Sequence, residues 1–195
     1  MEIEYRYEHL PELKKLPLRQ HIVVLSGAGM SAESGLSTFR DKDGLWKQYD
    51  WKRLASAAGF YEDPEAVLEF YNMRRKRLLE AEPNHAHKLI AELEKWHDVT
   101  IITQNVDNLH ERAGSSNVIH LHGELAKVTS SDDRNNPDCI KELPLDVPIR
   151  IGDKAVDGSQ LRPYIVWLVR YAHPEIPRFI INPGEDYDPY DDHFP

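Results

Sequence analysis

The feature that most constrains the fold is an apolar run that leads directly into a glycine-rich turn. Residues 21–25 (His-Ile-Val-Val-Leu) are mostly apolar and β-branched, which predicts a buried strand, and the glycines after them let the backbone turn sharply. Ser31, Ala32 and Glu33 are then expected to open a helix. A diphosphate bound at such a turn would meet backbone N–H groups and the positive end of a helix. The pattern therefore points to a dinucleotide.

Two sets of residues would contact this dinucleotide. The turn itself contributes Gly27, Ala28, Gly29, Ser31 and Ala32. Their spacing fits the G-x-G-x-x-G/A pattern, which is weak alone because an ordinary strand-to-helix turn can share it. Farther along, Phe39, Arg40 and Trp46 are expected to form a flap whose rings and guanidinium cover the nucleotide.

Composition narrows the class of protein. A chain of 195 residues suits one α/β domain with room for a small inserted module. The net charge of −9 disfavours binding to nucleic acid or to an anionic membrane. The single cysteine, Cys139, excludes an intrachain disulfide and suits a reducing compartment. No apolar run is long enough to span a membrane, so we expect a cytoplasmic location.

Strand and helix patterns in succession predict an α/β fold: a Rossmann-like parallel sheet with helices on both faces and a small loop-rich insertion. Asp63-Pro64-Glu65 is a strong helix start, and that helix should run to about Leu79. The other expected elements are a helix at 84–96 and strands at 99–103, 118–121, 164–167 and 178–181.

We expect four parts along the chain. Residues 1–20 form an N-terminal arm, and residues 184–195 form an acidic tail. The Rossmann-like domain, which would bind the dinucleotide, combines residues 21–125 and 161–183. The small module between them takes residues 126–160, which are rich in Asp, Asn, Pro and Lys.

Gln104, Asn105 and Asp107 directly follow the second predicted buried strand. In an open parallel sheet, ligands bind at the carboxyl ends of the strands. Each of these residues by itself could be a mere turn former. Three amide or carboxylate groups together favour contact with a ligand.

His120 and His122 lie on an alternating stretch and are expected to face the same side, just before Gly123. Two histidines could bind a metal, but residues two apart on a strand need a third and a fourth ligand, and the other histidines show no matching pattern. A single histidine acting as general base asks for less, because its neutral form is available near pH 7.

These motifs together resemble the sirtuin family of NAD-dependent protein-lysine deacylases. The matching stretches, in the family's order, are residues 27–40, Gln104-Asn105-Val106-Asp107, Leu109-His110, Ala113-Gly114, Leu121-His122-Gly123-Glu124 and Val166-Trp167. They span most of residues 21–168, which makes the combination far more specific than a glycine-rich turn.

The resemblance implies removal of acyl groups from protein lysine, giving nicotinamide and O-acyl-ADP-ribose. It implies that His122 is the catalytic base acting on the NAD ribose, and that Asn105 and Asp107 hold the ribose and the nicotinamide amide. Val166 and Trp167 would pair with the backbone of an acylated peptide as an added strand. Peptide preference should then be loose.

The chain departs from the family in its small module. Most sirtuins hold a structural zinc with four cysteines there, whereas residues 126–160 contain Cys139 alone. We therefore expect no zinc, and we expect packing and turn hydrogen bonds to hold the module.

A second departure follows Trp167. Family members continue with a helix, a strand ending in Gly-Thr-Ser and another helix, but here residues 168–171 lead almost directly to residues 178–182. A strand with its crossover, roughly 30 or more residues, is missing from the sequence. Asn182 remains as the expected adenosine contact. An omitted internal segment, a true deletion and a sheet that closes around the gap are alternatives.

Two other functions remain open. The missing segment favours an NAD- or ADP-ribose-binding module that is impaired in catalysis. A dehydrogenase fits less well, because that fold expects an acidic residue at the end of a strand about 20 positions after the glycines, and no apolar strand precedes Asp50.

Tyr71 and Arg74 lie one helical turn apart on the helix predicted to start at Pro64. Arg74 also opens a basic run, residues 74–77, that could be a solvated helix face. The spacing resembles that of the bacterial sirtuin subgroup that removes succinyl and malonyl groups, where this pair binds the acyl carboxylate. We therefore expect acidic acyl groups to be accepted alongside acetyl.

Overall fold

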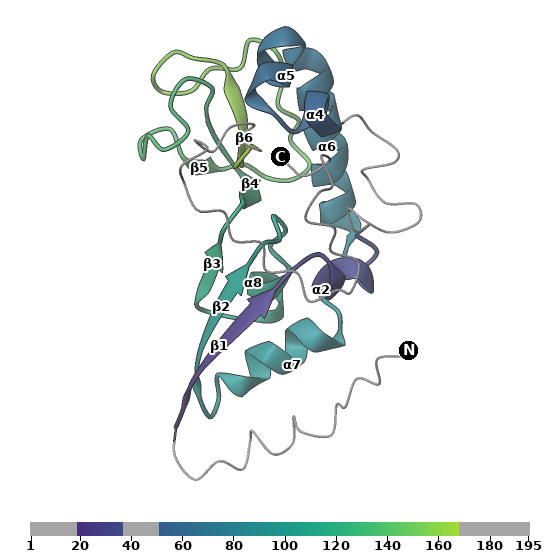
Figure 1. The fold of residues 1–195 in the computed structure, drawn as a ribbon, viewed down its shortest axis with the longest axis vertical. Coiled ribbons are helices and arrows are strands. Elements are labelled where there is room, and N and C mark those ends of the chain that lie inside the picture. The colour runs from purple at the N-terminus through teal and green to yellow at the C-terminus, as the bar shows by residue number, and fades with distance from the viewer. Residues whose placement is uncertain (1–18, 37–50, 168–195) are drawn as a thin grey trace, which may run out of the picture.

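The structure, a computed structural model, describes residues 19–36 and 51–167. Within these ranges the chain forms two three-stranded sheets, with a long helix, α6, beside the second (Figure 1). Several predictions lie outside the described residues: the flap residues Phe39, Arg40 and Trp46, the contact Asn182, and the strand at 178–181.

The first sheet is parallel, with strand order β1-β2-β3. Its strands are β1 (His21–Ser26), β2 (Asp98–Thr103) and β3 (Val118–His120). The last residues of β1 and β2, Ser26 and Thr103, are direct partners in the register, so the two strands end side by side. The predicted parallel α/β fold is confirmed, and each of these strands lies within one residue of its expected bounds.

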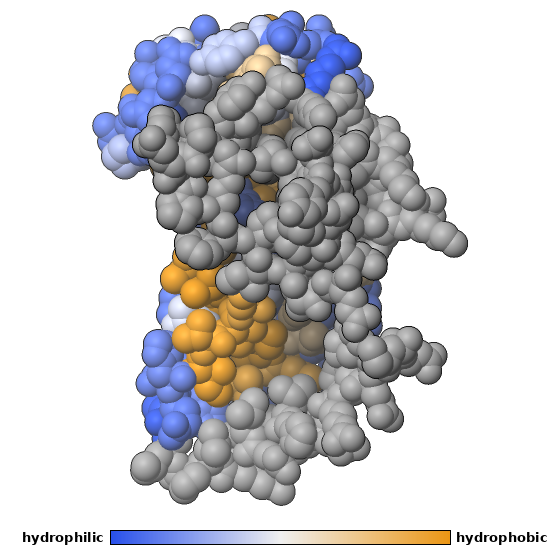
Figure 2. All heavy atoms as spheres, viewed as in Figure 1, coloured by the Kyte–Doolittle hydropathy of each residue, from blue (hydrophilic) through white to orange (hydrophobic). Residues whose placement is uncertain are grey.

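Helices cover one face of this sheet. The predicted helix at 84–96 is α7 (His85–Leu93), which begins at the N-cap Asn84. Apolar side chains of the strands and of α7 pack together there: Ile22, Val24, Val99, Ile101, Val118, Ile90 and Leu93. On the opposite face Val23, Leu25 and Ile119 are exposed, and Figure 2 shows an apolar surface over these strands.

α6 (Pro64–Glu80) begins where predicted and ends one residue past Leu79. The Asp63 carboxylate caps it by accepting a hydrogen bond from the Ala66 N–H at 3.1 Å, and Pro64 occupies the first turn. The shorter helices are α2 (Gly29–Ala32), α4 (Trp51–Leu54), α5 (Ala57–Glu62) and α8 (Leu109–Ala113). Over the ranges that the structure covers, no helix is both long and apolar enough to cross a bilayer.

The second sheet is antiparallel, with strand order β5-β4-β6, where the sequence predicted a loop-rich insertion. Its strands are β4 (Gly123–Ser130), β5 (Lys141–Glu142) and β6 (Leu161–Ile165). β6 begins three residues before the predicted strand at 164–167, and it pairs with β4 rather than with the parallel strands. The sequence did not predict this sheet, because turns rich in Asp and Asn lie between its strands and make the whole of residues 126–160 look like a loop. The division of the chain into domains stays a prediction.

Arg75 of α6 connects this helix to the second sheet and the loop after β5 through hydrogen bonds to backbone carbonyls. It is fully buried, and its guanidinium donates to the backbone carbonyls of Leu125, Leu143, Pro144 and Val147. Beside it, the Asn72 amide donates to the Ile149 carbonyl at 2.8 Å and accepts from the Ile149 N–H at 2.9 Å. The basic run at 74–77 is therefore not a uniformly solvated face.

Candidate functional site

The polar residues predicted from the sequence meet at the carboxyl ends of the parallel strands. The glycine-rich turn follows β1, and Gln104, Asn105 and Asp107 follow β2. His120 is the last residue of β3, and His122 lies in the turn between β3 and β4. The prediction that both histidines lie on one strand is therefore wrong: His120 ends β3, and His122 lies outside it.

A buried hydrogen-bond network connects the turn after β1 to the loop after β2. The Asn105 amide donates to the Gly27 carbonyl and to the Ser31 hydroxyl, both at 3.0 Å. The Ser31 hydroxyl donates to Asp107 Oδ2 at 2.9 Å, and the Leu109 N–H donates to Asp107 Oδ1 at 3.2 Å. Both N–H groups of the Asn105 side chain thus have protein acceptors. Its oxygen is the side-chain atom suited to accept from a ligand.

Three polar residues to which the sequence assigned no role lie beneath this network. Ser26 Oγ lies 2.9 Å from Thr103 Oγ1 and 3.1 Å from His110 Nε2, and all three residues are buried. Thr103 Oγ1 also accepts from the Asn105 backbone N–H at 3.0 Å. Burial lowers the pKa of His110 although the charges of Asp107 and Glu111 oppose the shift. The sequence signal for this layer was the hydroxyl residue that ends each of the first two parallel strands, Ser26 in β1 and Thr103 in β2.

His122 is exposed and has a defined tautomer. Its Nδ1 lies 2.9 Å from the Gln104 backbone oxygen, which can only accept, so Nδ1 carries the proton. The neutral ring then presents an unprotonated Nε2, as a general base requires. The Val166 N–H donates to the His122 carbonyl at 3.0 Å, which places residue 166 beside this histidine.

His120 lies between the loop after β2 and helix α8. Together with Glu111 and Glu124 it places three atoms of metal-binding types within 4.8 Å of one another. Protein groups already occupy them, because both His120 nitrogens face oxygen atoms and Lys127 pairs with Glu124 at 2.7 Å. We assign no metal to this cluster.

Tyr71 and Arg74 lie close together on α6. Tyr71 is 1% exposed, and the Arg74 guanidinium carbon lies 5.7 Å from its ring centroid. Burial lowers the pKa of Arg74, whereas the charges of Tyr71 and Asp107 oppose this shift, which puts Arg74 near the buried network. Trp167 packs on Phe60 with ring centroids 5.0 Å apart.

Arg162 of β6 adds a second guanidinium to this cluster. Its guanidinium carbon lies 3.7 Å from the centroid of the Trp167 ring, and the residue is 4% exposed. Burial lowers the pKa of Arg162 to about 10, although the Tyr71 hydroxyl favours its charge. No motif or spacing in the sequence singles out Arg162.

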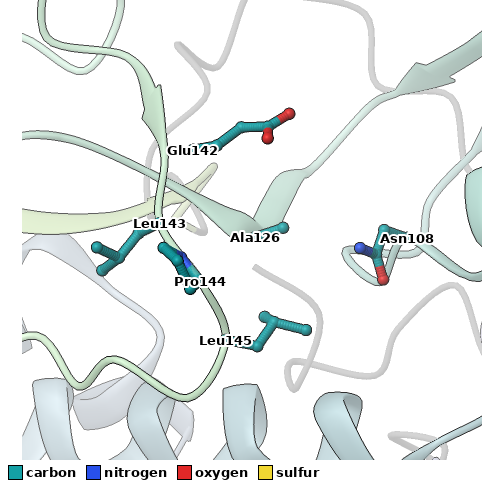
Figure 3. Close-up of a pocket in the computed structure, with 6 residues that line it drawn as sticks. All are labelled: Asn108, Ala126, Glu142, Leu143, Pro144 and Leu145. Carbon is teal, nitrogen blue, oxygen red and sulfur yellow. The ribbon is translucent and has the colours of Figure 1, made fainter.

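A cleft of about 340 Å³ lies next to the loop after β2 but contains none of the predicted site residues. Figure 3 shows its lining: Asn108, Ala126, Glu142, Leu143, Pro144 and Leu145. The lining is mostly aliphatic, and Glu142 is its one ionisable side chain. The polar residues at the strand ends, which include a histidine and two side chains in a buried network, are therefore the better candidate for chemistry.

The glycine-rich turn leaves space for a phosphate. Among the described residues, a Cβ atom added to Gly29 would meet nothing within 4 Å, and one added to Gly27 would meet only Gln104 Oε1, at 3.7 Å. The N–H groups of Met30 and Ser31 are used inside the turn, by the carbonyls of Gly27 and Ala28. Space beside these glycines fits the close approach of a phosphate, and the Asn105 side chain is tied to the same turn through its bond to the Gly27 carbonyl.

Comparison with known proteins agrees with this geometry. Residues 27–173 match the Sir2 family. Over 158 residues the chain is 61% identical to an NAD-dependent protein deacylase of Bacteroides thetaiotaomicron, an alignment that covers 80% of this chain and 67% of the relative.

Solved structures give the same result. A Sir2 homologue in complex with ADP-ribose has a TM-score of 0.69 and 39% identity, over 86% of this chain and 65% of that one. A Sir2 homologue in complex with NAD has a TM-score of 0.65 and 41% identity, over 82% of this chain and 60% of that one. The chain thus spans between 60% and 67% of the length of these relatives.

Proposed function

The chain belongs to the Sir2 family, and from this premise we propose that it is an NAD-dependent deacylase of protein lysine. The observation that carries the proposal is the exposed His122 at the strand ends, whose Nδ1 donates a hydrogen bond to the Gln104 backbone carbonyl. The similarity to a named NAD-dependent deacylase, and to structures bound to NAD and ADP-ribose, supports the cofactor. A cytoplasmic location stays a prediction, based on the single cysteine and on the lack of a long apolar run in the sequence.

In this proposal each residue has a distinct task. NAD would supply the ADP-ribose that accepts the acyl group as nicotinamide leaves. His122 Nε2 would take a proton from a ribose hydroxyl. Asn105 would accept a hydrogen bond through its oxygen, and Asp107 would keep Ser31 and the turn in place.

His122→Ala tests the proposal directly. Deacylation of an acetylated peptide should be abolished, while NAD binding measured by calorimetry should be largely retained, because proton transfer follows binding. The matched control is His85→Ala, since His85 is an exposed histidine at the start of α7. Near-normal turnover by the His122 variant would reject this residue as the base.

The alternative is an NAD- or ADP-ribose-binding module without turnover. It is favoured by the missing segment after Trp167. Nicotinamide release separates the two functions: an enzyme releases nicotinamide faster when an acylated peptide is added, and a binding module does not. Intact mass of the purified chain would decide whether the sequence omits an internal segment.

We further propose that Tyr71 and Arg74 bind the carboxylate of succinyl- or malonyl-lysine. Their proximity on α6 supports this proposal, because a guanidinium and a phenol can donate three hydrogen bonds to one carboxylate. Arg74→Met should weaken desuccinylation by about 1.5–3 kcal/mol, the value of a hydrogen bond to a charged group, and change deacetylation little. Arg77→Met, at an exposed position on the same helix, is the control. Equal losses of desuccinylation and deacetylation activity would show that Arg74 has a structural role and does not bind the acyl carboxylate.

The peptide is proposed to bind beside Val166 and Trp167. β6, which directly precedes them, is an edge strand of the second sheet as far as the structure describes it. An edge strand can pair with an extended peptide through backbone hydrogen bonds, so sequence preference should be loose. Turnover of acyl-lysine peptides with scrambled flanking residues should therefore vary little.

We also propose that the small module needs no zinc. The Asp157 carboxylate accepts from the Ser159 N–H at 3.0 Å and from the Ser159 hydroxyl at 2.7 Å, and Ser130 Oγ lies 2.7 Å from Ser159 Oγ. Hydrogen bonds from Ser130 and Ser159 lower the pKa of Asp157 to about 2. Protein purified without added metal should contain no stoichiometric zinc by elemental analysis, and chelators should leave its thermal unfolding unchanged.

A further inference from the structure

His120 connects the loop after β2 to helix α8. Its Nδ1 lies 2.9 Å from the Asn105 backbone oxygen, and its Nε2 lies 2.7 Å from Glu111 Oε1. The His120 side chain is 6% exposed and that of Glu111 37%. This histidine thus contacts the backbone of Asn105, a proposed NAD-binding residue. The proposed chemistry assigns no role to His120.

Both neighbours of the His120 ring are hydrogen-bond acceptors. A backbone carbonyl cannot donate, and a carboxylate donates only when it is protonated. A neutral imidazole has one N–H and can satisfy only one of the two, whereas an imidazolium satisfies both. The geometry therefore describes a charged His120 paired with an ionised Glu111.

The surrounding charges agree with this protonation state. Burial opposes a charged ring, but the hydrogen bonds to Glu111 and Asn105, and the charges of Glu111 and Glu124, raise the pKa of His120. Glu124 comes from β4, where Lys127 partly offsets its charge. On the α8 side the other titratable group is His110, whose pKa is lowered, so it adds no positive charge near pH 7.

We propose that Glu111 and His120 form a positioning pair that orients Asn105 for NAD. His120 fixes the Asn105 carbonyl while the amide of the same residue bonds Gly27 and Ser31. His122 holds the preceding carbonyl, that of Gln104, so two histidines fix two successive peptide groups. The inference rests on the proposed function and assigns residues that contact no NAD themselves.

The pair has a pH signature. When His120 loses its proton at alkaline pH, its Nε2 lone pair faces the Glu111 carboxylate, and the ring no longer suits both acceptors. NAD affinity should therefore fall severalfold as the pH rises through the raised pKa of His120. Glu111→Gln should lack this alkaline fall, because an amide N–H can donate to the neutral ring. His120→Ala should lose about tenfold in affinity, in line with one hydrogen bond to a charged group.

Two measurements test the proposal. NMR titration of the isolated protein gives the pKa of His120, which should lie above about 6.5 and fall in Glu111→Gln. Calorimetry gives NAD affinity against pH for the wild type, Glu111→Gln, His120→Ala and the control Glu82→Gln, which removes an exposed ion pair to Arg112 of α8. Circular dichroism confirms that each variant is folded.

A His120 pKa at or below the ordinary value would overturn the pair. An alkaline fall that persists in Glu111→Gln, or wild-type affinity in a folded His120→Ala, would overturn its role in positioning. Absence of NAD binding by the wild type would overturn the proposed function and this role with it. The NMR titration would still decide whether the charged pair exists, so the two failures are distinguishable.

Discussion

Gly123, which directly follows His122, has a backbone conformation that residues with a side chain rarely adopt. Its φ is 81°, and an added Cβ atom would lie 2.0 Å from the Tyr164 backbone oxygen. This contact lies where β4 and β6 pair as antiparallel strands, with Gly123 opposite Ile165. The sequence placed a glycine beside the candidate base, but only the partner strand shows why a side chain cannot fit.

Gly123→Ala should therefore destabilise the protein more than an ordinary glycine substitution. The positive φ alone costs about 1–2 kcal/mol for a residue with a side chain, and the overlap with Tyr164 adds to it. Gly152→Ala is the matched control, because its φ is 94° but an added Cβ atom would meet no atom of the residues in the structure within 4 Å. Equal losses in urea-derived free energies of unfolding for the two variants would show that the overlap relaxes freely.

At the scale of elements, α6 holds the second sheet mainly through Arg75. One buried guanidinium donates to four carbonyls, those of Leu125, Leu143, Pro144 and Val147. The sequence shows a basic run of four residues and cannot show which one points inward. Helical periodicity places Arg75 between Tyr71 and Leu78, both buried, and that spacing was the available signal.

Arg75→Met should cost about 3 kcal/mol or more in unfolding free energy, because several buried carbonyls would lose their donors at once. The loss should appear as a lower midpoint in urea unfolding. Arg77→Met serves as the control, since Arg77 is exposed on the same helix and should change the midpoint little. A small effect at residue 75 would mean that water replaces the guanidinium.

Helices α7 and α8 meet through two buried histidines. The rings of His87 and His110 lie edge to face, with centroids 4.8 Å apart. Burial, and then the charge of His110, lowers the pKa of His87 to about 4. Below pH 6.5 the unfolded chain binds a proton at His87 that the native state does not, so stability falls as the pH drops toward 4.

His87→Phe should flatten this acid dependence. One pKa unit corresponds to about 1.4 kcal/mol, so His87 accounts for at most roughly 3 kcal/mol between neutral pH and pH 4. Urea unfolding of the wild type and the variant at several pH values isolates this contribution, because the carboxylates are common to both proteins. Parallel stability curves would exclude His87 as the source.

At the scale of the whole molecule, one face of the parallel sheet exposes apolar side chains. Val23 is 55% exposed, Leu25 63% and Ile119 47%. Figure 2 shows a continuous apolar area over the parallel strands, and patches of this kind favour association or dye binding.

The double variant Val23→Thr/Ile119→Thr should bind less of a hydrophobic dye than the wild type. Threonine keeps the β-branched shape that suits a strand while it removes apolar surface. Val156→Thr is the control, because Val156 is 72% exposed but lies in the small module. Dye fluorescence that is unchanged in the double variant would show that this face is covered in solution.

The sequence by itself determined the local elements and the place of the site. Apolar periodicity and the Asp63 cap predicted the parallel strands and α6, because these signals act over a few neighbouring residues. Asn105, Asp107 and His122 were expected at the strand ends and lie there, and their roles stay predictions. Only the tertiary structure decided the pairing of β4 with β6, the burial of Arg75 and the partners of His120. Each of these depends on which distant segments pack together, and the free energy of such contacts comes from burial and from acceptors that local sequence does not specify.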